Sequence, residues 1–272
     1  LPIFYASADL KAWTELSEIP TLGAPGEIWE CPLLIELPVE RTDETRWLFK
    51  VDVLRGAPGS GALGLIGTFD GVRFTPDPDG WQVLDMGTDF YAAIAWHEPR
   101  DAAGRPAWIG WMGNHAYQGR LPHQGWRGAM SVPRRMSLVR VDGGHRLRQE
   151  LEPAAVQGIP LAALDAATVP AATRLELPAG GDFTLSLADS EGRLLMLERR
   201  GEQLALTRRD AVSPFLDAVC RTRLAQEHGL SVWLDYGSIE LLDQTGTLAL
   251  TMQHRMAGDL WSMRYRTGAA PA

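Results

Sequence analysis

The chain has 272 residues, of which 45% are hydrophobic, so it can bury a sizeable core and global disorder is excluded. The 26 basic and 34 acidic residues give a formal net charge of −8. This balance argues against a nucleic-acid partner and against binding to an anionic membrane surface. No apolar run reaches the roughly 18 residues that a membrane-spanning helix needs. The composition is compatible with an uncharged substrate.

The chain begins without methionine, at the strand-like segment Leu1–Tyr5, and no signal peptide is visible. We therefore expect Leu1 not to be the start of the gene product. Secreted, periplasmic and cytoplasmic locations in a bacterium all stay open.

Two cysteines, Cys31 and Cys220, are too few for a disulfide framework or a cysteine-based zinc site. A single bridge between them is one alternative, but we expect two free, buried thiols. The spacing of His97, His115 and His123 does not match a set of metal ligands. We expect neither a metal nor a cofactor.

Short apolar runs separated by Gly, Pro and Asp clusters fill the first 150 residues, for example residues 47–53, 62–69 and 108–112. Asp70-Gly71 between two such runs predicts a hairpin. Helical periodicity is nearly absent, and many short strands with frequent turns indicate a sandwich, barrel or propeller. Ten tryptophans and five tyrosines suit a carbohydrate site, although aromatic residues are also ordinary core residues.

Residues 149–165 are Ala-rich with two prolines and predict a linker with a short helix at most. Alternating strand patterns return after it and favour a second all-β domain, most simply a sandwich. We therefore divide the chain into a first domain, a linker and a second domain, at residues 1–148, 149–165 and 166–272. The strands expected in the second domain are 182–187, 193–198, 204–207, 230–235 and 239–242.

Six segments in order along nearly the whole chain carry a family resemblance. They are Phe4–Leu10 with Trp13, Trp29–Pro32, Leu84–Ala93, Trp111–Asn114 with Tyr117, Trp126–Arg134 and Leu234–Glu240. Each resembles a block of glycoside hydrolase family 32, which includes invertases, levanases and exo-inulinases. The resemblance implies the later blades of a five-bladed β-propeller followed by a β-sandwich, which agrees with the all-β patterning.

Two family blocks are absent from this sequence. Family enzymes carry the nucleophilic aspartate in an Asn-Asp-Pro-Asn-Gly block, and a further substrate-binding carboxylate in an Arg-Asp-Pro block. The superficial match Asp77–Gly80 follows the Asp70-Gly71 hairpin and predicts a surface turn. Chain order suggests that the first two blades are missing, so the missing N-terminal segment is a candidate partner.

The resemblance assigns Glu30 as the general acid/base of a retaining glycosidase, which needs two carboxyl groups about 5–5.5 Å apart. Its neighbours Trp29, Cys31 and Pro32 give the apolar setting that keeps an acid protonated. The alternative is a strand-end surface glutamate. Asp85 and Asp89 are candidates for binding sugar hydroxyls, and their alternative role is to cap a turn around Gly87.

Trp111 and Asn114 are further candidates for substrate binding at the pocket mouth, although Trp111 also suits a propeller core. We expect Arg127 and Arg134 to be structural residues that pair with carboxylates between blades, and Asp235 and Glu240 to be structural in the sandwich. Leu33 and His115 depart from the family pattern, which has Asp and often Trp there. These departures concern substrate details.

The function that the resemblance implies is release of fructose from sucrose, levan or inulin by a retaining two-carboxylate mechanism. The alternative is a catalytically inactive, truncated carbohydrate-binding or scaffold fragment, because loss of the nucleophile removes covalent catalysis. A related propeller hydrolase with another sugar specificity is disfavoured by the Leu84–Ala93 and Trp126–Arg134 blocks.

Overall fold

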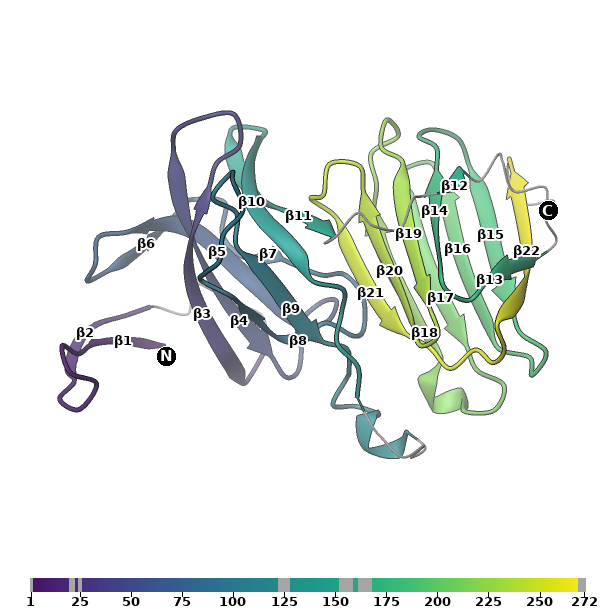
Figure 1. The fold of residues 1–272 in the computed structure, drawn as a ribbon, viewed down its shortest axis with the longest axis horizontal. Coiled ribbons are helices and arrows are strands. Elements are labelled where there is room, and N and C mark those ends of the chain that lie inside the picture. The colour runs from purple at the N-terminus through teal and green to yellow at the C-terminus, as the bar shows by residue number, and fades with distance from the viewer. Residues whose placement is uncertain are drawn as a thin grey trace.

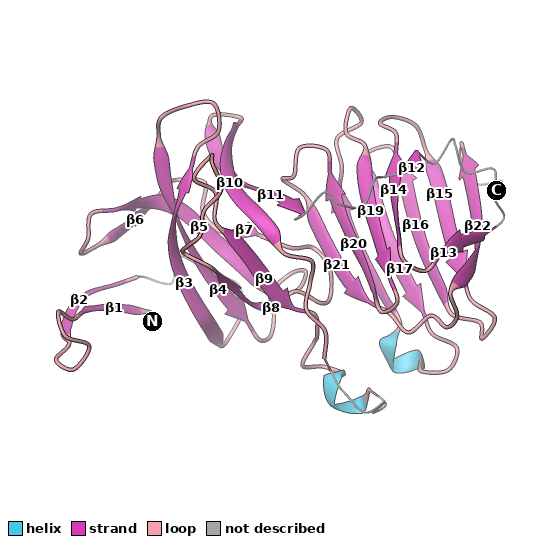
Figure 2. Ribbon diagram, in the orientation of Figure 1, coloured by secondary structure: helices cyan, strands magenta, loops and turns pink. Residues whose placement is uncertain are grey.

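The computed structural model describes residues 2–19, 23, 26–121, 128–151, 159–160 and 168–268. Figure 1 shows two all-β parts side by side, the first containing strands β1 to β11 and the second containing β12 to β22. Figure 2 shows that helix in the described residues is confined to two short 3-10 turns, Gln118–Arg120 and Pro214–Leu216. No helix in these ranges is long and apolar enough to cross a membrane.

The first part consists of a hairpin and two antiparallel sheets, which we call the first blade and the second blade. The hairpin pairs β1 with β2, the first blade has the order β3-β4-β5-β6 with β7 also on β5, and the second blade has the order β11-β10-β9-β8. Strands β3 and β8, at one edge of each blade, contact each other. The strands are β1 (Ile3–Ala6), β2 (Thr14–Glu18), β3 (Trp29–Pro38), β4 (Thr45–Val53), β5 (Ala62–Phe69), β6 (Phe74–Pro76), β7 (Gln82–Val83), β8 (Tyr91–Ala95), β9 (Ala107–Trp111), β10 (Arg134–Val141) and β11 (Gly144–Leu151).

One apolar core joins the two blades. Leu33, Ile35 and Leu48 of the first blade and Trp108 and Met136 of the second belong to a single buried cluster. Each strand contributes alternate residues to this core, which explains the period of two in the sequence. The blades therefore form one packed unit.

The predicted hairpin at Asp70-Gly71 is confirmed. The Asp70 carboxylate accepts hydrogen bonds from the backbone N–H groups of Val72 and Arg73, at 2.8 and 2.6 Å. Gly71 has a φ of 93°, a conformation that glycine adopts without strain. The segment Asp77–Gly80 is a turn at the surface, as predicted.

The second part is a sandwich of two sheets with the orders β12-β14-β19-β20-β21 and β13-β22-β15-β16-β17-β18. Its core is lined mainly by leucines from both sheets, such as Leu175, Leu197 and Leu241, with Trp261 among them. The strands are β12 (Ile159–Pro160), β13 (Thr168–Pro170), β14 (Thr173–Leu177), β15 (Phe183–Ala188), β16 (Leu194–Arg200), β17 (Gln203–Arg209), β18 (Ala218–Arg223), β19 (Leu230–Asp235), β20 (Ser238–Asp243), β21 (Ala249–Gln253) and β22 (Leu260–Thr267). The expected all-β architecture of propeller blades followed by a sandwich is confirmed.

The first and second parts meet along strand β21. The outer edge of this strand forms backbone hydrogen bonds with the segment that precedes β8. Met86 N–H donates to Ala249 O at 2.8 Å, and Asp89 N–H donates to Thr251 O at 3.1 Å. Gly87 lies between these bonds, where an added Cβ would come within 1.8 Å of the Thr251 oxygen. A glycine is required here because the two backbones are in direct contact.

The expected boundary at residue 148 falls inside β11, which continues to Leu151 because it pairs with β10 along its whole length. Within the expected linker, β12 pairs in parallel with β14. The short helix considered for the linker, and also His123, Trp126 and Arg127, lie outside the described residues.

Both cysteines are free, as expected, but only Cys220 is buried. The expectation of a buried Cys31 is wrong, because a local irregularity of β3 turns this residue to the surface.

Candidate active site

Glu30 lies at the start of β3, where a bulge between Glu30 and Leu33 interrupts the pairing with β4. Cys31 in this bulge has a φ of 49°, a left-handed conformation that is uncommon for residues other than glycine. Cys31 and Pro32 are exposed, and Glu30 is half-buried. Bulges often lie next to active sites because they re-aim a side chain out of the ladder.

Tyr91 at the start of β8 donates a hydrogen bond from Oη to Glu30 Oε2 at 2.6 Å and so connects the two blades. Strand β8 has its own bulge between Tyr91 and Ile94, in which Ala92 has a φ of 50°. Burial raises the pKa of Tyr91 far above its usual range, and the hydrogen bond to Glu30 makes a smaller contribution in the same direction. The hydroxyl therefore stays protonated and acts as the donor.

A buried ion pair lies across the ladder from Glu30. Asp52 is the cross-strand partner of Glu30, and it forms an ion pair with Lys50, both side chains being fully buried. Lys50 Nζ also donates to Ala93 O at 2.8 Å, in the bulge of β8. Burial raises the pKa of Asp52 to about 6, even though Lys50 lowers it, and burial lowers the pKa of Lys50.

Lys50 and Asp52 are not among the site residues predicted from the sequence, although β4 contains a signal for them. Lys50 and Asp52 are two residues apart, so they share a face with Leu48, which is fully buried. Two charged residues on a core face are rare unless they are paired. The pattern therefore identifies a buried pair, but the proximity to Glu30 depends on the register between β3 and β4.

Aromatic rings surround Tyr91 on the side of the second blade. The ring centroids of Trp111 and His115 lie 6.3 and 5.0 Å from that of Tyr91, each with an edge-to-face geometry. Tyr91, Asn114 and His115 also line a hollow of about 140 Å³ together with the loop 53–61 of the first blade. The structure thus brings Trp111 and Asn114 to the surroundings of Glu30.

Asn114 uses its amide within its own loop. Its Nδ2 donates to Thr88 O at 2.9 Å, and its Oδ1 accepts from Ala116 N–H at 2.9 Å. Both ends of the amide are thus occupied, and the substrate-binding role of Asn114 stays a prediction.

Asp85 lies at the junction with the sandwich and is fully buried. Its Oδ1 accepts the N–H groups of Gly87 and Thr251 at 2.8 and 2.9 Å, and its Oδ2 contacts Arg134 at 3.0 Å and the Thr251 hydroxyl at 2.6 Å. Both oxygens are therefore used by the protein. These contacts favour the alternative that Asp85 caps the turn at Gly87.

Asp89 is buried at the same junction. Gln253 donates to it from the backbone N–H at 3.1 Å and from Nε2 at 2.8 Å, and Tyr117 donates from its hydroxyl. Arg208 of the sandwich lies 3.4 Å away as an ion-pair partner. Like Asp85, Asp89 holds the segment before β8 against the sandwich and has no exposed oxygen for a sugar.

Arg134 connects the second blade with the sandwich, and it is fully buried. It forms ion pairs with Asp85 at 3.0 Å and Glu240 at 2.8 Å, and its guanidinium group lies 4.4 Å from the centroid of the Phe90 ring. Glu240 also accepts the N–H of Val132 at 2.8 Å. Arg134 therefore pairs with carboxylates, but one of them, Glu240, belongs to the sandwich and does not lie between blades as expected.

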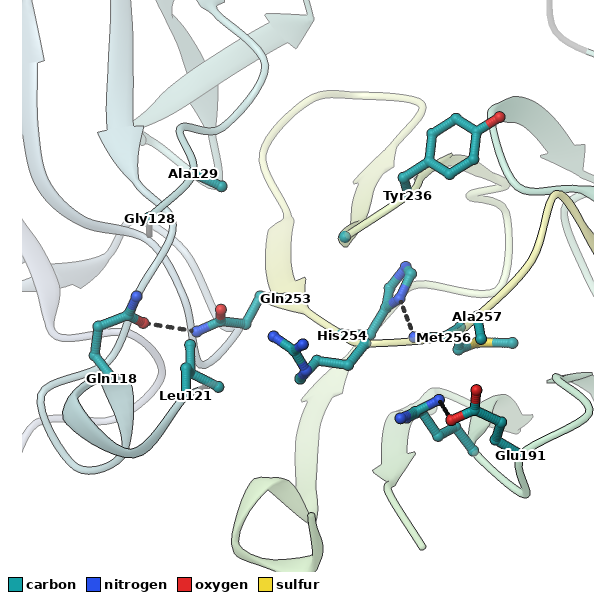
Figure 3. Close-up of a pocket in the computed structure, with 13 residues that line it drawn as sticks. Gln118, Leu121, Gly128, Ala129, Glu191, Tyr236, Gln253, His254, Met256 and Ala257 are labelled. Carbon is teal, nitrogen blue, oxygen red and sulfur yellow. Dashed lines mark hydrogen bonds and ion pairs between the residues drawn. The ribbon is translucent and has the colours of Figure 1, made fainter. Parts of the chain in front are cut away.

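A larger hollow of about 440 Å³ lies between the 3-10 turn at Gln118 and the sandwich. Figure 3 shows the side chains of Gln118 and Gln253 facing each other there, joined by a hydrogen bond of 3.2 Å. His254 accepts the Met256 N–H at Nδ1 and donates to Ser238 O from Nε2. Burial lowers the pKa of His254 to about 4, so this ring is neutral.

Comparisons with known proteins support the family resemblance of the sequence. A sequence model of the glycosyl hydrolases family 32 N-terminal domain matches residues 2–150. Levanase of Bacillus subtilis is 39% identical over 153 residues, which cover 54% of this chain and 23% of levanase. Invertase of Schizosaccharomyces pombe is 39% identical over 137 residues, which cover 50% of this chain and 23% of that protein.

Solved structures match along almost the whole chain. The exo-inulinase from Aspergillus awamori has a TM-score of 0.75 and 25% identity, covering 98% of this chain and 62% of the exo-inulinase chain. The β-fructofuranosidase from Schwanniomyces occidentalis, complexed with fructosyl-erythritol, has a TM-score of 0.77 and 20% identity, and covers 97% of this chain and 61% of that chain. The chain therefore spans only part of the length of these relatives. On the match to residues 2–150, it belongs to glycosyl hydrolases family 32.

Proposed function

We propose that Glu30 is the general acid/base of a retaining β-fructofuranosidase that releases fructose from sucrose or from fructans such as levan and inulin. The observation that carries this proposal is the hydrogen bond of 2.6 Å from Tyr91 to the half-buried Glu30, at the meeting point of two bulges. The relatives named levanase, exo-inulinase and invertase support the substrate class.

The hydrogen bond from Tyr91 gives the two oxygens of Glu30 different roles. Tyr91 donates to Oε2, so a proton on the carboxyl group belongs on Oε1. In the first step this proton passes to the oxygen of the leaving group. In the second step the carboxylate takes a proton from the attacking water, while Tyr91 keeps the side chain in place.

The nucleophile has to come from another segment. Asp52 is the carboxylate opposite Glu30 in the ladder, but it is fully buried and paired with Lys50, so it is shielded from a sugar. Family enzymes use the aspartate of an Asn-Asp-Pro-Asn-Gly block, which this sequence does not contain. The partner that completes the site is an N-terminal segment with this block.

The remaining predicted residues divide into two groups. Trp111 and His115 lie beside Tyr91 and offer ring faces and edges to the apolar C–H side of a sugar. Asn114 shapes the adjoining loop. Asp85 and Asp89 act at the junction, where they anchor the segment that leads into β8 and therefore into Tyr91.

The test is fructose release from sucrose, levan and inulin by the 272-residue chain, alone and joined to an N-terminal segment that carries both absent blocks. We expect the chain alone to be inactive and the joined protein to be active. Glu30→Gln in the joined protein should lower the rate about 10²- to 10⁴-fold, the usual contribution of a general acid. Glu36→Gln on the same strand is the control and should keep the activity.

Three outcomes would contradict the proposal in different ways. Activity of Glu30→Gln at the level of the unchanged protein would remove Glu30 from the mechanism. Activity of the chain alone would place the nucleophile within it. Inactivity of the joined protein would favour a non-catalytic scaffold or carbohydrate-binding fragment.

A further inference from the structure

The two strands that carry Glu30 and Tyr91 both break their regular pairing directly after these residues. Within the two bulges, Cys31 and Ala92 have φ values of 49° and 50°. Such conformations are unfavourable for residues with a Cβ atom, and they persist only where the surroundings hold them. The structure must therefore contain groups that fix both bulges.

One buried ammonium group reaches both of them. Lys50 Nζ donates to Ala93 O at 2.8 Å in the bulge of β8, and it lies 3.5 Å from Cys31 O in the bulge of β3. Its third partner is the carboxylate of Asp52 on its own strand. Lys50 thus connects three strands at the level of Glu30.

Stability alone does not account for this pair. Both side chains are fully buried, and Asp52 Oδ1 is without a hydrogen-bond partner in the described part of the chain. Removing two charges from water is so unfavourable that apolar residues of similar volume often stabilise a fold equally well. The pair is therefore an unfavourable choice for a core position unless the ammonium group serves another purpose.

We propose that Lys50 is a positioning residue for the acid/base: its ammonium group fixes the bulges of β3 and β8 and so holds Glu30 within hydrogen-bonding distance of Tyr91. Asp52 keeps the ammonium group charged. This inference rests on the proposed function of Glu30.

The variant that tests it replaces both charges with apolar residues, Lys50→Met with Asp52→Leu. A single change at Lys50 would leave a buried, unpaired carboxylate and would threaten the fold itself. The double change keeps the volume of the core and removes the bonds of Lys50 to Ala93 and Cys31, together with the interaction of Asp52 with the backbone N–H of Ala92. The control removes an exposed pair in the sandwich, Arg223→Met with Glu202→Leu.

The first readout is amide hydrogen exchange of the 272-residue chain, which is independent of activity. We expect exchange at residues 30, 31 and 33 and at residues 91–94 to become at least tenfold faster in the double variant. Exchange in the sandwich and the thermal unfolding of the chain should stay close to those of the unchanged protein. The control should leave exchange at both bulges unchanged.

The second readout is sucrose hydrolysis by the protein joined to its N-terminal segment. We expect kcat to fall at least tenfold, with KM changed less than threefold, because the sugar-binding surface is untouched while the acid is misplaced. A merely structural role would lower the amount of folded enzyme without this separation of kcat and KM.

The two readouts separate the two proposals. If the unchanged joined protein releases no fructose, the proposed function fails, and the exchange experiment still decides about Lys50. A folded double variant that retains slow exchange at both bulges would overturn the positioning role. Retention of kcat within twofold in an active joined protein would overturn it as well.

Discussion

Two groups of buried charges in this molecule differ in how completely their carboxylate oxygens are hydrogen-bonded, although Arg134 Nε and Arg208 Nη2 at the junction have no partner among the described residues. At the junction with the sandwich, the carboxylate oxygens of Asp85, Asp89 and Glu240 all have partners within the protein. Around Glu30, a carboxyl group is half-exposed, and Asp52 Oδ1 has no partner among the described residues.

The backbone shows the same difference. The segment before β8 makes backbone hydrogen bonds to β21 on both sides of the turn at Gly87, whereas β3 and β8 are bulged where they carry Glu30 and Tyr91. Carboxylates whose oxygens are all hydrogen-bonded stabilise a junction, while left-handed backbone conformations and unpaired carboxylate oxygens are typical of functional sites. We therefore regard the junction as structural and the Glu30 group as the site of chemistry.

The largest effect is expected from breaking the junction. Arg134→Met should lower the free energy of unfolding by about 3–5 kcal/mol, because it leaves the buried carboxylates of Asp85 and Glu240 without their cation. Urea unfolding measures the change. Arg140→Met, which removes an exposed partner of Glu44, is the control and should cost less than about 1 kcal/mol. A loss at Arg134 no larger than the control would contradict a structural role for the junction.

Acid should destabilise the sandwich side of the junction through His254. Its folded pKa of about 4 lies below the ordinary 6.5, so its contribution to stability is present above pH 6.5 and is lost as pH falls toward 4. The loss amounts to roughly 3 kcal/mol. Urea unfolding at pH 7 and pH 4.5 should show a weaker acid dependence for His254→Gln than for the exposed control His97→Gln. Equal acid dependence of the two variants would exclude a buried neutral ring.

Acid should have the opposite effect on stability at Asp52, the buried carboxyl group opposite Glu30. The folded pKa of Asp52, about 6, lies above the ordinary 3.8, so the stability contributed by its protonation is full below pH 3.8 and is lost as pH rises through 6. Between pH 7 and pH 4.5, the unchanged protein should gain about 2 kcal/mol relative to Asp52→Asn. Urea unfolding of both proteins across this range gives the difference. A constant difference would show that Asp52 does not titrate there.

The smallest effect on stability is expected at Tyr91. Tyr91→Phe removes only the hydrogen bond to the half-buried Glu30, so the free energy of unfolding should fall by about 1 kcal/mol or less. The rate of fructose release by the joined protein should nevertheless fall about tenfold, since Glu30 loses its orientation. If Tyr91→Phe is strongly destabilised but retains its specific activity, Tyr91 has a structural role and not the orienting role that we assign to it.

The sequence predicts local features of this fold well. The hairpin at Asp70-Gly71 and the strand at residues 62–69 follow from the turn residues and the alternation, and both occur as expected. The prediction of a buried Cys31 failed because residue type alone does not reveal a bulge.

Long-range contacts explain what could not be predicted at the site. The turn around Gly87 is visible in the sequence. Thr251, which donates a hydrogen bond to the buried Asp85, lies 166 residues further along the chain. The choice between sugar binding and structure at Asp85 therefore needed the tertiary fold. The place of Lys50 beside Glu30 could not be predicted for the same reason, because its contact with Ala93 joins two different blades.

In the proposed mechanism Glu30 supplies the proton to the leaving group, and the most direct test varies that group. In the chain joined to an N-terminal segment that carries both absent blocks, the rates of Glu30→Ala should be compared for sucrose and for a nitrophenyl β-fructofuranoside, with and without azide. We expect a large loss on sucrose, which needs an acid, and only a small loss on the activated substrate when azide is present, because azide attacks without a base and gives a fructosyl azide product. Equal losses on both substrates, without effect of azide, would contradict the assignment of Glu30 as the acid/base.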